Sequence, residues 1–308
     1  MQELIRRGVD VKAKNNIDRK ALHWAAGAGH EQALRLLLQH DAAVDDEDCF
    51  GMNALLLASW FGHLKILQIL VNAGAKINCE NKNGLNLLHC AAQRGHIKVM
   101  EFIMEDLEDV RVDKLDKSML TGKNQTGSQH VESRNQVRRS APNLSNVDLM
   151  QEQNTALHLA AKNGYSKVLQ KIVETGVDVD EKNIEGLTAL HFSAEGGHYE
   201  CVKLLLESGC DINAQTNKNM NALHYVALHG YENVVRLLLE GGINMDAMNN
   251  QHATPLHIAV LSNFPGTVKL LIDDKCDLDI ADSVSIAFPS LLFPSYVKSH
   301  LCLCSKSI

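Results

Sequence analysis

Two similar stretches, TALHLAAKNG at residues 155–164 and TALHFSAEGGH at residues 188–198, give the strongest indication of the fold. Their opening tetrapeptide recurs in one phase along the chain, and its fourth residue falls at positions 23, 56, 89, 158, 191, 224 and 257. Neighbouring positions lie 33 residues apart, except that 69 residues separate positions 89 and 158. A fixed period of this length is typical of a repeat architecture.

Each period contains the signals of two short helices. Asn or Thr opens most tetrapeptides and can cap a helix, with Thr155, Thr188 and Thr254 as the strongest candidates. A glycine permits a tight turn into a second helix at positions 29, 62, 95, 164, 197 and 230. Runs such as VKLLLES (202–208) predict that this second helix buries one face. Segments such as VDVDEKN (177–183) then predict a short extended loop that leads to the next repeat.

The pattern resembles the ankyrin-repeat family, whose motif T-P-L-H-x-A-A-x-x-G-H is nearly complete in both stretches. The resemblance implies an all-α solenoid of stacked helix-turn-helix units with short hairpin loops. It places a partial repeat in residues 1–15, three repeats in 16–114 and four in 151–282. The order of the repeats, including ALHWAAGAGHEQALRLLLQH (21–40), looks like that of the ankyrin repeat and death domain-containing proteins. Within that group it looks most like the B-type member.

Two segments break the period. Residues 115–150 contain no Phe, Trp or Tyr and many polar side chains, so we expect a degenerate or disordered insertion that proteases cut first. Residues 283–308 carry neither the tetrapeptide nor the turn glycine, and we expect a divergent tail that is not a repeat. They also predict no death-domain-like bundle, so we expect no death-domain adaptor role. A splice variant or truncated gene product would explain both breaks.

Composition limits the classes of partner and compartment. The chain has 308 residues, 45% of them hydrophobic, which is enough to build a core. Its formal charge of −7 creates no basic field, so we expect no nucleic-acid partner. No apolar run is long enough for a membrane span and the N-terminus predicts no signal peptide, which favours a cytoplasmic protein. The eight cysteines contain no CxxC pair and are expected to be reduced.

The many histidines do not predict an enzyme. Ten of the fifteen occupy two phases of the repeat, which indicates a structural role. The resemblance implies that the tetrapeptide histidines bond the turn and the adjacent repeat. No HExxH, GxSxG or P-loop motif is present. We therefore expect no catalytic residue, cofactor or metal.

These observations predict a non-catalytic scaffold or adaptor that binds other proteins, with intracellular signal transduction as its setting. The alternative is a truncated or variant repeat product that competes for a partner.

The two positions before each turn glycine suggest where a partner binds. Their occupants are mostly small or polar, so the adjacent Trp60 and Phe61 are unexpected on an open surface unless a partner covers them. Arg94, Leu228 and His229 occupy the same phase and complete the candidate site. The alternative is that Trp60 and Phe61 pack into the groove beside the neighbouring repeat.

Two positions are candidates for modification. Leu205, Asp211, Ile212 and Asn213 match the spacing at which ankyrin repeats resemble substrates of the oxygen-sensing asparaginyl hydroxylase, which would modify Asn213. The alternative is that Asn213 is only a turn residue. Ser140 follows two arginines and is a candidate for phosphorylation by a basophilic kinase.

Overall fold

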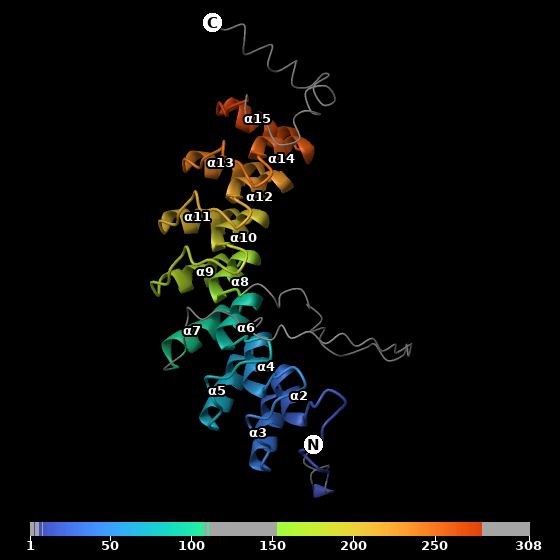
Figure 1. Cartoon of the computed structure of the whole chain (residues 1–308). Helices are drawn as coiled ribbons and strands as arrows, with labels where there is room; N and C mark the ends of the chain where they lie inside the picture. Colours follow the sequence, from blue (N-terminus) through green and yellow to red (C-terminus); the bar gives the residue numbers. More distant parts are fainter. Residues whose placement is uncertain (1–2, 4–5, 8, 108–109, 111–152, 279–308) are drawn as a thin grey trace, which may run out of the picture. The chain divides into compact units, whose positions relative to one another are not determined.

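The computed structural model describes residues 3, 6–7, 9–107, 110 and 153–278, and every regular element within them is a helix. The all-α prediction is confirmed. The chain divides into two compact units, residues 1–178 and residues 179–308. Figure 1 labels the helices of both units. The segments 115–150 and 283–308, including Ser140, lie outside the described residues.

Helices in the described part of the first unit come in pairs, and we call the first member of each pair inner and the second outer. The pairs are α2 (Ala21–Gly27) with α3 (Glu31–Gln39), α4 (Ala54–Phe61) with α5 (Leu64–Asn72), α6 (Leu87–Arg94) with α7 (Ile97–Glu105), and α8 (Ala156–Lys162) with α9 (Ser166–Val173). Inner helices pack on inner helices and outer helices on outer ones.

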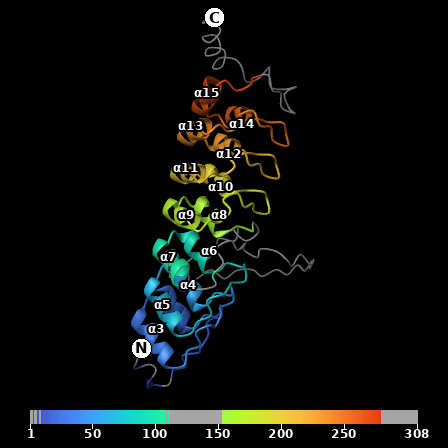
Figure 2. The same cartoon turned by 90° about the vertical axis from the view of Figure 1, so that its left-hand side faces the viewer.

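The second unit has the same construction. Its pairs are α10 (Ala189–Glu195) with α11 (Tyr199–Glu207), α12 (Ala222–His229) with α13 (Glu232–Glu240), and α14 (Pro255–Leu261) with α15 (Pro265–Asp273). In each unit the connecting hairpins project from the inner helices, on the side away from the outer helices (Figure 2).

Small side chains let the inner helices approach one another closely. Ala91 and Ala92 of α6 and Ala160 and Ala161 of α8 are all completely buried. Larger aliphatic side chains, such as Leu67 of α5, fill the space between inner and outer helices and are also buried. The core is therefore continuous along the stacked pairs of each unit.

The inner helices begin where the tetrapeptide predicts. The three threonines predicted as caps all stand at the N-cap, and the Thr155 side chain accepts the amide of His158 (3.4 Å). All three threonines donate their own amides to the Nδ1 atom of the tetrapeptide histidine, Thr155 at 3.0 Å and Thr188 and Thr254 at 3.2 Å. The cap residue and the histidine together satisfy amides that the first turn leaves without partners.

The tetrapeptide histidines also join consecutive repeats. Because His191 Nδ1 accepts a hydrogen bond from the Thr188 amide, the proton of the neutral ring lies on Nε2, which donates to the carbonyl of Met220 in the next repeat (3.1 Å). His224 lies in the same way against Ala253 O (3.2 Å). Burial lowers the pKa of His224 to about 4, which keeps its ring neutral at physiological pH. The predicted structural role of these histidines is thus explained by their bonds to the helix cap and to the next repeat.

A second set of bonds joins the hairpins. Asp180 accepts the amide of Asp211 (2.9 Å), and Asn213 Oδ1 accepts the amide of Asn244 (2.7 Å). In the first unit Asp45 accepts the amide of Lys76 (2.9 Å). Side chains from one repeat therefore satisfy the backbone of the next, which holds the hairpins in register.

The repeats on either side of residues 115–150 stack directly. His89 Nε2 lies 3.2 Å from Asn154 O, the same bond that links His191 to its following repeat. Lys171 Nζ donates to Glu105 Oε1 (2.6 Å), and α6 packs on α8. The boundary between the two compact units falls after Asp178. The repeats on either side of residues 115–150 therefore belong to the same unit, although the sequence period is interrupted between them.

Candidate protein-interaction rim

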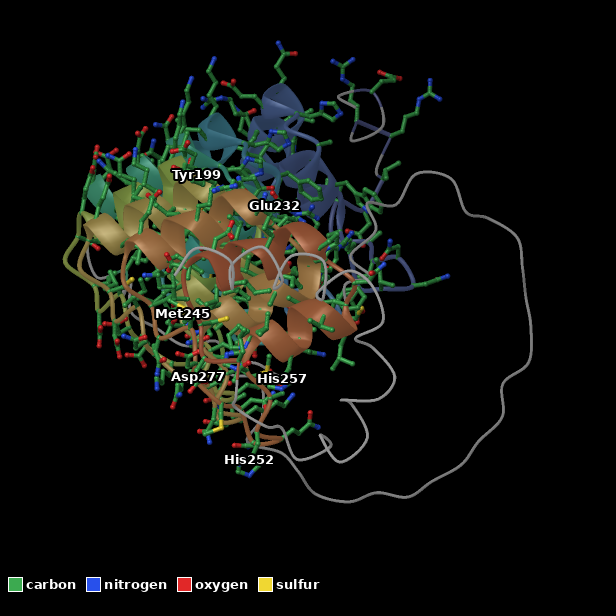
Figure 3. The ribbon with its side chains drawn as sticks, turned by 90° about the horizontal axis from the view of Figure 1, so that it is seen from above. Tyr199, Glu232, Met245, His252, His257 and Asp277 are labelled. Atoms are coloured by element: carbon green, nitrogen blue, oxygen red, sulfur yellow. The ribbon has the colours of Figure 1, made fainter. Side chains whose placement is uncertain are left out.

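The turn between inner and outer helix carries the residues that we predicted to bind a partner. We define the rim as the last two residues before each turn position and the first turn of the outer helix after it. In the second unit the rim residues Tyr199 and Glu232 lie across the helix layers from the hairpin residues His252 and Asp277 (Figure 3). The rim and the hairpins are therefore separate surfaces.

Each turn is shaped by the repeat that follows it. Gly62 has φ of 76°, and a Cβ there would lie 2.5 Å from His96 Nδ1. His96 Nε2 donates to the carbonyl of Trp60 (3.0 Å), so the ring is held against the turn. Tyr165 covers Gly95 of the preceding repeat in the same manner. The rim is thus a rigid surface made jointly by neighbouring repeats.

Trp60 does not lie on an open surface. It is only 7% exposed, and the guanidinium of Arg94 lies over its ring at 4.5 Å from the centroid. The expectation of an exposed tryptophan is wrong, because Arg94 of the next repeat covers it. The alternative of packing beside the neighbouring repeat describes Trp60 better, and any part in binding stays a prediction.

Phe61 and Arg94 remain accessible to a partner. Phe61 is half-buried, and its ring lies 3.5 Å from the point where a Cβ on Gly27 would stand. Arg94 is exposed although it rests on Trp60. The structure therefore brings Trp60, Phe61 and Arg94 together in the first unit.

Leu228 and His229 form the corresponding part of the rim in the second unit. Leu228 is 41% exposed, and His229 is exposed with its ring stacked on Tyr231 at 5.8 Å. An exposed leucine beside an aromatic pair gives this rim an apolar surface.

Comparison with known proteins assigns the architecture. A model of ankyrin repeats in three copies matches residues 1–81, 130–216 and 208–282, and one of many copies matches residues 61–103. The chain belongs to the ankyrin-repeat family. The ankyrin repeat domain of human ASB11 is similar, with a TM-score of 0.67, 20% identity, and coverage of 84% of this chain and 99% of that one. The ankyrin repeat domain of Bcl-3, a member of the IkappaB protein family, has a TM-score of 0.59 and 22% identity over 82% and 98% of the two chains.

Ankyrin repeats are protein–protein interaction modules, and this fold class is the one that the sequence predicted. The sequence reasoning nevertheless missed part of the rim. Lys65, Lys98 and Lys167 are exposed, and each is the second residue of its outer helix. Their common position, three residues after the turn glycine, is visible in the sequence and could have identified them.

Asn213 occupies a structural position in its ankyrin hairpin. It is exposed, yet its amide donates to Asp211 Oδ1 (2.9 Å) and its Oδ1 accepts the amide of Asn244 (2.7 Å). Leu205 is fully buried in α11. An enzyme that reads both Leu205 and Asn213 must therefore open this repeat first.

The described ankyrin repeats contain no group of three or more His, Cys, Asp and Glu side chains that could hold a metal ion. Six cysteines in this part of the chain are free thiols. Burial raises the pKa of Cys79 and Cys201 to about 11 each, so both thiols stay protonated and are poor nucleophiles. Among the helices of the described ranges, none has the length and apolarity needed to cross a membrane.

Proposed function

We propose that this ankyrin-repeat chain is a non-catalytic adaptor that holds partner proteins on its rim, in cytoplasmic signal transduction. The observation that carries the proposal is the chemistry of the rim. Phe61 and Leu228 offer apolar contacts, while Arg94 and His229 offer polar ones, all at the same turn position. Interfaces commonly combine such apolar centres with polar surroundings.

Two further observations support a non-enzymatic, intracellular role. The tetrapeptide histidines are engaged in caps and inter-repeat bonds, which leaves these rings to structure. The free, protonated thiols suit a reducing compartment. The closer likeness to the ankyrin repeat and death domain-containing proteins is the basis for proposing a signalling setting.

Site-specific crosslinking tests the rim as the binding surface. The full chain would carry a photoreactive residue at Phe61 or Leu228, or at the exposed hairpin residue Met248 as a control, in cytosolic extract. We expect a discrete partner to crosslink from the two rim positions and not from 248. The same partner, purified, should bind the chain at least about tenfold more weakly after Leu228→Glu or Arg94→Glu. Crosslinking from position 248 alone, with unchanged affinity in both variants, would contradict the proposal.

The proposed function includes two covalent modifications. We propose hydroxylation of Asn213 and phosphorylation of Ser140 as regulatory events on this adaptor. Incubation with the hydroxylase, iron, oxygen and its oxoacid cosubstrate should add one oxygen to the Asn213 peptide, as read by mass spectrometry. A fully covered, unmodified peptide rules out the first modification, and treatment with a basophilic kinase tests Ser140 in the same way.

A further inference from the structure

The rim of the first unit carries a row of cations. Lys65 on α5, Lys98 on α7 and Lys167 on α9 are exposed and occupy the same position in three consecutive outer helices. These helices pack side by side, α5 on α7 and α7 on α9. Arg94 adds a fourth exposed cation at the adjoining end of α6. At least one positive charge per repeat therefore lies along this face, with two in the repeat of α6 and α7.

Carboxylates are absent from the three sequence segments that form this surface. Residues 60–68, 93–100 and 162–173 contain no Asp or Glu. Within the described part of the chain, Lys65, Lys98 and Lys167 take part in no ion pair. Glu101 follows Lys98 by one turn, and Glu105 is bonded to Lys171 (2.6 Å). The positive charge of the three lysines is therefore not neutralised by carboxylates in the first turns of α5, α7 and α9.

The position of the lysines is electrostatically unfavourable for the fold itself. Each lies in the first turn of a helix, where backbone amides already create positive potential and acidic side chains are preferred. Three of the other four outer helices in the described ranges follow that preference, with Glu31 in α3, Glu200 in α11 and Glu232 in α13, whereas α15 has no acidic residue in its first turn. The whole chain carries a formal charge of −7, so an excess of basic residues in its composition does not explain the row of lysines.

We propose that the lysine row binds an extended acidic peptide segment of a partner protein, with an acidic side chain at every third residue. This inference rests on the proposed function and specifies the partner at the same rim. Packed helices lie about 10 Å apart, and a peptide in the extended polyproline II conformation has three residues per turn and advances about 3.1 Å per residue. Every third side chain of such a peptide points to the same face, about 9 Å from the previous one. Three lysines on three adjacent helices therefore match carboxylates spaced three residues apart over about seven residues. A nucleic acid carries a phosphate at every nucleotide, and the phosphates beyond this short row would meet the net negative charge of the chain, whereas a peptide with three spaced carboxylates places its charges on the lysines alone.

Binding of a labelled peptide to the full chain tests the row. The probe carries three glutamates, one at every third position, and the comparison peptide has the same composition with the glutamates adjacent. We expect the spaced peptide to bind severalfold more tightly and to weaken as salt rises. The triple variant Lys65→Glu, Lys98→Glu, Lys167→Glu should lose at least about tenfold in affinity, since each exposed pair contributes modestly.

The second unit supplies a matched control. Lys203, Arg236 and Lys269 are exposed and lie one per repeat on α11, α13 and α15, but away from the rim. Reversing these three changes the net charge equally and should leave peptide affinity within about twofold. Thermal melting checks that both triple variants fold.

The inference would be overturned if the full chain bound both peptides with equal affinity, or if both triple variants lost the same peptide affinity. It would also be overturned if a single-stranded oligonucleotide bound more tightly than the spaced peptide. Rim crosslinking that persists without peptide binding would reject the lysine row alone. Absence of rim crosslinking in the parent chain would instead reject the proposed function.

Discussion

At the scale of single residues, the two tryptophans of this chain offer a direct test of burial. Trp60 is 7% exposed beneath Arg94, whereas Trp24 is 40% exposed. We expect Trp60→Ala to lower the free energy of unfolding by about 3 kcal/mol, because it opens a cavity between repeats. Trp24→Ala should cost about 1 kcal/mol, since less of its area leaves water on folding. Urea unfolding measures both, and equal losses would mean that Trp60 does not anchor the inter-repeat contact.

A buried ion pair gives a second residue-scale prediction. Arg19 Nε donates to Asp48 Oδ2 (2.8 Å), and the two side chains are only 4% and 0% exposed. Asp48 Oδ1 also accepts the amides of Phe50 and Met52, a task that Asn81 performs in the next hairpin. Met52 takes the place of Arg19 there, because the side-chain amide of Asn81 donates to the Met52 sulfur (3.5 Å).

These equivalences define a double-mutant cycle. Asp48→Asn alone should destabilise the chain by about 3 kcal/mol or more, because it leaves the Arg19 charge buried without its counter-ion. Arg19→Met combined with Asp48→Asn recreates the arrangement of the next repeat and should return stability to within about 1 kcal/mol of the parent. Additive losses in denaturant titrations would refute the pairing.

At the scale of the helix pair, the turn glycines serve two different purposes. Gly62 and Gly74 both have positive φ, 76° and 84°, so alanine strains either turn by about 1 kcal/mol. A Cβ on Gly74 meets nothing within 4 Å, while one on Gly62 lies 2.5 Å from His96. Gly62→Ala should therefore be clearly more destabilising than Gly74→Ala in thermal unfolding, because His96 must also leave Trp60. Similar melting temperatures would show that the ring is free to move.

At the scale of the whole molecule, the stacking of α6 on α8 predicts how the chain responds to a cut. A protease site engineered within residues 115–150 should yield two fragments that remain together in size-exclusion chromatography. The reason is that His89, Glu105 and the buried inner helices contact residues beyond the cut. Substituting Lys171→Glu should weaken this association, and fragments that separate immediately would contradict the direct stacking.

The fold class, the helix pairs and the structural role of the histidines could all be predicted from the sequence. Those features depend on local signals, since a cap such as Thr155 and a turn glycine such as Gly62 act within a few residues. The burial of Trp60 could not be predicted in this way, because it depends on Arg94 of the following repeat, which covers the ring. The tertiary structure also shows that α6 and α8 are neighbours despite residues 115–150 between them. Contacts between repeats join residues more than twenty positions apart. A periodic pattern predicts that such contacts exist, but it does not predict which side chains they bury.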